Sequence, residues 1–164
     1  MKRLIMAVAV ATSMTVMMVL LAAPTWAQTT YSDDVQGTEY AAVSGQSGSF
    51  VGRASGGLPG VMNVTVTYAG GSPGPNVTES ITGGDWSLSG RWGRVFGSFS
   101  GGTVQWNADG TLANIEADMS VSGGSVSGVP ISGGSGTFGG VLDHRPLAQH
   151  RPPKVAGTLR LVLS

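Results

Sequence analysis

The chain has 164 residues, with nine Lys and Arg against nine Asp and Glu, 27 glycines and no cysteine. This length fits one domain, and the balanced charge gives no electrostatic attraction to nucleic acid or to an anionic membrane. Without cysteine there are no disulfides, so stability must come from packing and sheet hydrogen bonds. For an exported protein, this also favours a bacterial source.

Residues 1–27 have the pattern of an export signal. Lys2 and Arg3 precede an apolar run over residues 4–23, and Ala27 provides a small residue where a signal peptidase would cut. The run is also long enough to span a bilayer as an uncleaved anchor. We expect cleavage before Gln28, a secreted, periplasmic or cell-envelope location, and no stable membrane insertion afterwards.

The next residues, 28–37, are mostly polar and include Asp33 and Asp34. We expect them to form a flexible, solvated lead. The rest of the chain, 38–164, is then a single glycine-rich β-domain with one basic, proline-rich loop at 143–154.

Alternation of apolar and polar residues recurs along the whole domain, as in strands with one face buried. It predicts an all-β fold of about eight to ten strands and no helix outside the signal. The expected strands are 39–43, 49–54, 62–68, 85–88, 94–99, 103–106, 113–121, 126–131, 137–142 and 155–163.

Turn residues support antiparallel pairing. Asp109-Gly110 supplies the positive φ of a tight hairpin, and repeated Gly-Gly pairs are interpreted as strand ends at which the backbone bends or bulges. Glycines inside strands allow strong coiling. We therefore expect a small antiparallel barrel of about eight strands, with a two-sheet sandwich as the alternative.

Residues 129–140, with the sequence Val-Pro-Ile-Ser-Gly-Gly-Ser-Gly-Thr-Phe-Gly-Gly, resemble the Gly-Gly-Thr-Gly-x-Phe hairpin of the dirigent and allene oxide cyclase families. The resemblance implies an eight-stranded barrel with a central ligand cavity. The chain departs from those families after Leu142, where it runs into the polar residues 143–146. The acidic and Arg residues that work in their cavities lie outside the matched segment, so none is assigned here.

Aromatic residues concentrate in the middle of the chain. Trp86, Trp92 and Trp106, with Arg94 among them, are the candidate lining of a site for a small hydrophobic or sugar ligand. The alternative is that these tryptophans are simply the large core residues of a glycine-rich protein.

Other groups give weaker indications of chemistry. The repeats His144-Arg145-Pro146 and His150-Arg151-Pro152, with Lys154, concentrate positive charge in one loop, which could contact an anion or a metal or could be a mobile surface loop. Glu116 and Asp118 share one face of a strand and are expected to face solvent. No residue set predicts a cofactor or a metal site.

Three classes of function follow. The leading one is an exported barrel that binds a small ligand or a surface partner without converting it. The second is a dirigent-like or cyclase-like enzyme acting on a small hydrophobic molecule, which a buried acid inside the barrel would favour. The third is a structural or adhesive surface protein. The sequence leaves the ligand, any catalytic activity and the oligomeric state open.

Overall fold

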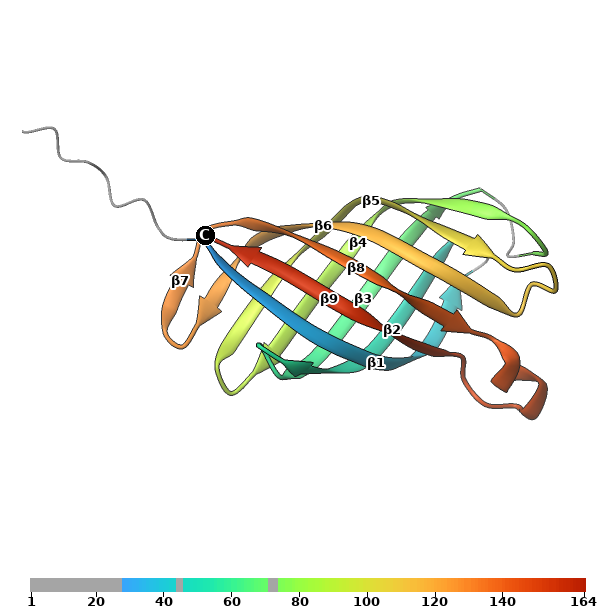
Figure 1. Cartoon of the computed structure of the whole chain (residues 1–164), viewed down its shortest axis with the longest axis horizontal. Coiled ribbons are helices and arrows are strands. Elements are labelled where there is room, and N and C mark those ends of the chain that lie inside the picture. The colour runs from blue at the N-terminus through green and yellow to red at the C-terminus, as the bar shows by residue number, and fades with distance from the viewer. Residues whose placement is uncertain (1–27, 44–45, 71–73) are drawn as a thin grey trace, which may run out of the picture.

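The described chain folds as a closed antiparallel barrel with one extra short strand (Figure 1). The computed structural model describes residues 28–43, 46–70 and 74–164. The barrel strands are β1 (Thr29–Val43), β2 (Ser47–Gly56), β3 (Gly60–Ala69), β4 (Thr78–Gly90), β5 (Gly93–Trp106), β6 (Leu112–Val126), β8 (Gly134–Asp143) and β9 (Lys154–Leu163); the extra strand is β7 (Val129–Ile131).

Closure is completed by the pairing of β5 with β6. Around the barrel the order is β5-β4-β3-β2-β1-β9-β8-β6, and every pairing is antiparallel. The predicted all-β barrel is confirmed. The sandwich alternative is wrong, because closure leaves none of these eight strands with a free edge.

The barrel has two distinct ends. At the terminal end, Thr29 pairs with Leu163, and the β7 hairpin projects nearby (Figure 1). At the loop end lie the β5–β6 connection and the longer β8–β9 connection, which contains a short 3-10 helix, η1 (Arg145–Gln149). Among the described residues, no helix is long and apolar enough to cross a membrane.

The terminal half of the interior is filled by aliphatic side chains. Leu88, Val95, Leu159 and Leu161 have no measurable exposure, and Leu58, in the β2–β3 turn, is 1% exposed. Each comes from an inward position of its strand or turn, so this half is a packed core of interdigitating side chains.

The Gly-Gly pairs at 83–84, 101–102 and 123–124 lie inside strands at bulges, so the expectation that they end strands is wrong there. The pair at 133–134 lies at the junction of β7 and β8, as expected. Within β4, the register with β3 shifts by one residue just before Gly83 and Gly84. Gly84 has φ of 120°, and a side chain there would collide with the Thr65 carbonyl oxygen. Because the bulge moves the period-two pattern by one position, Ile81 and Trp86 are both buried although they are five residues apart.

A bulge also lies inside β5, so two predicted strands are one strand in the structure. Residues 94–99 and 103–106 both belong to β5, whose register with β6 shifts between Phe99 and Gly101. Conversely, the predicted strand 126–131 is interrupted, because Ser127 and Gly128 both have positive φ and turn the chain from β6 into β7. The predicted Asp-Gly turn is confirmed at Gly110, where φ is 69°.

Residues 29–37 form part of β1, so the expectation of a flexible lead is wrong. The segment pairs with β9 throughout, and with β2 from Asp33 onward. Asp33 is only 2% exposed, and its two carboxylate oxygens accept the Leu58 backbone N–H at 2.9 and 3.1 Å. Asp33 and Val35 share the inward face of β1. Because Asp33 is charged, the alternation of apolar and polar residues is interrupted, and the segment is predicted to be solvated.

Candidate functional site

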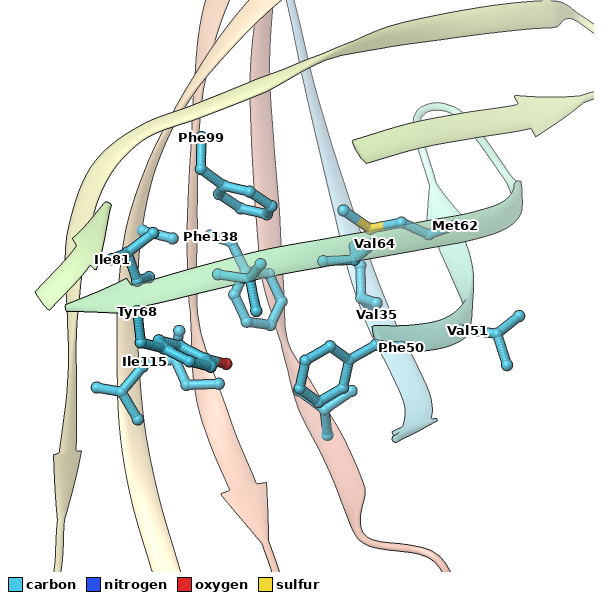
Figure 2. Close-up of a pocket in the computed structure, with 15 residues that line it drawn as sticks. Val35, Phe50, Val51, Met62, Val64, Tyr68, Ile81, Phe99, Ile115 and Phe138 are labelled. Atoms are coloured by element: carbon cyan, nitrogen blue, oxygen red, sulfur yellow. The ribbon is translucent and has the colours of Figure 1, made fainter. Parts of the chain in front are cut away.

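The interior holds a cavity of about 60 Å³ beyond the packed terminal half, on a measure in which one water needs roughly 10–15 Å³. Its walls are apolar side chains from most strands of the barrel (Figure 2), among them Val35, Phe50, Met62, Phe99, Ile115 and Phe138. Such a cavity has room for the body of a small ligand, and its apolar walls offer little to hold water.

Glycines shape one wall of this cavity. Gly140 and Gly157 are paired on β8 and β9, and a β-carbon on either would come 2.7 Å from Cζ of Phe138. The ring therefore lies against bare backbone, where any other residue would push it inward. The two glycines thus leave space free in the interior.

Five residues form a polar roof at the loop end of the cavity: Glu39, Tyr68, Glu79, Trp106 and His144. Trp106 Nε1 donates to Glu79 Oε2 at 3.0 Å, and His144 Nε2 lies 3.2 Å from Glu39 Oε2. The Trp106 and His144 rings meet edge to face, with centroids 4.8 Å apart. These contacts connect β1, β4 and β5 with the β8–β9 loop across the barrel.

Tyr68 belongs both to the roof and to the cavity wall. Its hydroxyl points toward Phe50 across the cavity (Figure 2). Burial, reinforced by the nearby carboxylates of Glu39 and then Glu79, raises the pKa of the Tyr68 phenol well above its ordinary range. Both acids are therefore close enough for their charge to act on the cavity.

Glu79 is the least satisfied member of the roof. It is 3% exposed, and while Oε2 accepts the Trp106 bond, Oε1 makes no hydrogen bond to any described residue. A buried carboxylate with an unused acceptor is costly unless a donor or a cation reaches it. Glu79 Oε1 is therefore the acceptor in the barrel that most needs a hydrogen-bond donor or a cation from a ligand.

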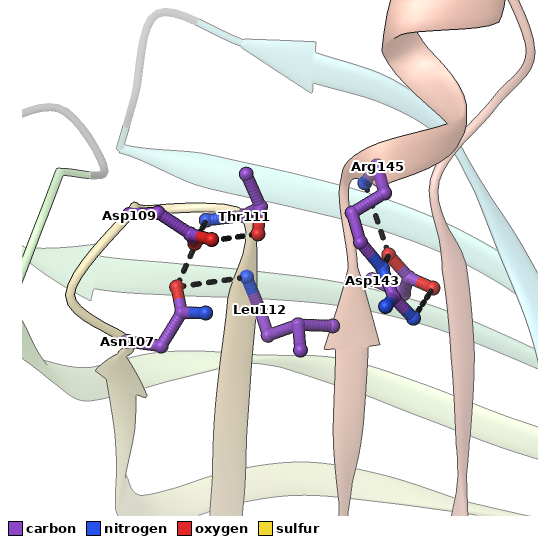
Figure 3. Close-up of polar contacts among 6 residues, drawn as sticks. All are labelled: Asn107, Asp109, Thr111, Leu112, Asp143 and Arg145. Atoms are coloured by element: carbon purple, nitrogen blue, oxygen red, sulfur yellow. Dashed lines mark hydrogen bonds and ion pairs between the residues drawn. The ribbon is translucent and has the colours of Figure 1, made fainter.

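Two loops hold the roof in place, and Figure 3 shows the polar contacts inside them. Asn107 Oδ1 accepts the backbone N–H groups of Thr111 at 2.9 Å and Leu112 at 3.1 Å, and the Thr111 carbonyl accepts the His144 backbone N–H at 2.8 Å. Asp109 accepts two bonds from Thr111, which lower the pKa of its carboxyl. The β5–β6 loop thus positions His144 in the roof, beside Glu39 and Trp106.

An exposed ion pair braces the start of the β8–β9 loop. Arg145 Nη2 lies 2.8 Å from Asp143 Oδ2, and Arg145 Nε lies 2.9 Å from Oδ1 (Figure 3). These hydrogen bonds hold the pKa of Asp143 down at about 2. The pair therefore stays intact across the neutral and mildly acidic range.

The four residues predicted to line a ligand site do not form one site, although Trp86 and Arg94 both line a pocket on the outer face of the sheet. Trp106 is in the roof, whereas Trp92 lies at the terminal end and donates to the Pro59 carbonyl at 2.8 Å. Trp86 is buried at 2% exposure, and its Nε1 has no partner among the described residues. Arg94 lies on the outer face, 5.6 Å from the Phe96 ring centroid. Of the four, only Trp106 belongs to the roof, and none lines the internal cavity.

The histidine-containing loop is partly built into the barrel. His144 joins the roof, while His150 is an exposed residue with φ of 54° at the end of η1. In the described part of the chain, no three His, Asp or Glu side chains gather as metal ligands. Glu116 and Asp118 face outward from β6, as expected.

Sequence reasoning missed Glu39, Tyr68 and Glu79 as site residues. The available signal was alternation: Glu39 continues the inward series of Val35, and Glu79 shares its face with Ile81. A charged residue in phase with apolar neighbours marks either a strand end or a buried functional group, and only the three-dimensional pairing distinguishes the two.

Comparison with known proteins gives no relative for this barrel: the chain matches no family model, no curated protein and no solved structure. The cavity and the polar roof are therefore the features that bear on its function.

Proposed function

We propose that this chain is an exported small-ligand-binding barrel that takes a small, mainly apolar molecule into its internal cavity without converting it. The observation that carries the proposal is the cavity of about 60 Å³ with apolar walls inside an otherwise packed barrel. Export is supported by the N-terminal pattern of residues 1–27, which lie outside the described residues. A structural or adhesive role would have no use for an internal cavity.

The test is ligand-dependent stability of the purified protein. A panel of small neutral hydrophobes, such as short alcohols and benzene, is screened by thermal shift. A compound at 100 times its dissociation constant should stabilise the native state by about 2.7 kcal/mol, which moves the melting temperature by several degrees.

Two variants locate the binding. Ala117→Leu adds three carbons at a buried position in the cavity wall, so it should abolish the shift while the protein still melts cooperatively. Val141→Leu changes an exposed residue on β8 and should leave the shift intact. If no compound stabilises the protein, or if Ala117→Leu responds like wild type, the proposal is wrong.

The buried acid favours a second candidate, an enzyme of the barrel type. Glu79 provides a buried carboxylate paired across the sheet with Val104, a residue of the cavity wall, and a carboxylate there could accept a proton from a bound molecule. In that case, a compound that binds would be converted, as detected by mass spectrometry. Glu79→Gln would stop the conversion without abolishing binding.

A further inference from the structure

We infer that the cavity selects a small amphipathic amine, with the apolar body in the cavity and the protonated ammonium group at the polar roof. This inference rests on the proposed binding function and specifies its ligand class.

The charge distribution is the first argument. The acids of the interior are Asp33 at the terminal end and Glu39 and Glu79 at the roof. Every Lys and Arg in the described part of the chain is exposed. The loop end of the cavity is therefore a region of negative potential in an apolar surrounding, where a carboxylate ligand would be repelled and a cation attracted.

The hydrogen bonding of the two roof acids is the second argument. Glu39 already has His144 within 3.2 Å. Glu79 has only the Trp106 N–H on Oε2, and its Oε1 has no partner among the described residues. An ammonium group brings both a donor and the compensating charge that a buried carboxylate lacks. An alcohol would bring only the donor.

The cavity walls are the third argument. The two acids are paired across the sheet with residues of the cavity wall, Glu79 with Val104 and Glu39 with Phe50. A ligand at the loop end of the cavity therefore lies near both acids. The rings of Phe50, Phe99 and Phe138 line the same space (Figure 2) and provide apolar surface for the body of the ligand. The volume of about 60 Å³ restricts the body to a few carbons.

Three probes of matched size test the inference: n-butylamine, 1-butanol and butyrate, each titrated into the purified protein at neutral pH and followed by NMR chemical shifts. The amine should bind at least about tenfold more tightly than the alcohol, and butyrate should bind most weakly. If the alcohol or butyrate binds as tightly as the amine, the amine inference is wrong while the binding proposal stands. If neither these probes nor the neutral hydrophobes bind, both proposals fail.

Variants then assign the contact. Glu79→Gln keeps an oxygen for Trp106 but removes the charge, so it should weaken n-butylamine binding about tenfold and leave 1-butanol binding nearly unchanged. The control Glu116→Gln removes an equivalent charge from the outer face and should change neither. An equal loss for amine and alcohol in Glu79→Gln would overturn the assignment. Should that variant fail to fold, the ranking of the three probes on wild type still decides.

Discussion

Replacing Asp33 with Ala tests whether residues 29–37 are part of the barrel. The variant removes both oxygens that accept the Leu58 N–H at 2.9 and 3.1 Å. It leaves that N–H buried without an acceptor, and it frees the turn that holds the Leu58 side chain at 1% exposure.

The size of the effect follows from these contacts. A hydrogen bond to a charged group is worth about 1.5–3 kcal/mol, and looser packing of Leu58 would lose part of the roughly 1.5–3 kcal/mol gained by burying its side chain. Relief from burying a carboxylate offsets some of this loss. We expect a net loss of about 2–3 kcal/mol in the free energy of unfolding, which lowers the melting temperature by about 7–10 °C in a domain of this size.

The assay is urea unfolding followed by tryptophan fluorescence, together with a thermal melt. Asp34→Ala is the matched control, because Asp34 is the next residue but faces solvent, with only a 3.5 Å contact from the Thr158 hydroxyl. The free energy of unfolding of Asp34→Ala should stay within about 0.5 kcal/mol of the wild-type value. Equal, small effects of both substitutions would refute the placement of Asp33 inside the barrel.

Three further predictions concern other parts of the barrel. Gly84→Ala should cost at least about 2 kcal/mol because φ is 120°, whereas Gly83→Ala has open space around it and should be nearly neutral in the same unfolding assay. The Asp143 carboxyl should titrate near 2 by NMR and move toward its ordinary 3.8 in Arg145→Gln; because the folded pKa is the lower one, the stabilisation is complete above about 4 and is lost as pH falls toward 2. The Tyr68 phenol has a raised pKa, so its contribution to the free energy of unfolding is complete below pH 10 and is lost as the pH rises further. Tyr68→Phe should remove the last step of the tyrosinate absorbance titration. The free energy of unfolding of this variant should also fall less steeply with alkaline pH than that of the wild type.

Much of the fold is predictable from the sequence because burial in a barrel follows strict alternation. The segments around Met62, Ile115 and Leu159 show it without interruption, and each is a barrel strand. Prediction fails where a bulge shifts the phase. In β5 one strand then resembles two, 94–99 and 103–106, and in β4 only the part after the bulge, 85–88, is predicted. Prediction also fails at Asp33, where a buried charge interrupts the apolar series.

The candidate site is less predictable than the fold, because its members come from separate segments. The pair formed by Glu39 and His144 is 105 residues apart in sequence, and no local motif relates the two positions. Trp106 was identifiable as a large aromatic residue. Its bond to Glu79 depends on how the bulged strands β4 and β5 pair, and the alternation of apolar and polar residues does not predict that register.

The contrast between the two halves of the barrel supports a binding role for the loop half. The terminal half shows that this chain can fill a barrel interior with leucine and valine, as at Leu88 and Leu161. In the loop half, the same architecture leaves a cavity and buries Glu79 with an unused oxygen. Both features reduce stability compared with a packed apolar core. Local departures of this kind concentrate at functional sites, and the two found here lie together, with Tyr68 reaching both. A ligand that fills the cavity and supplies a donor to Glu79 would offset both costs at once.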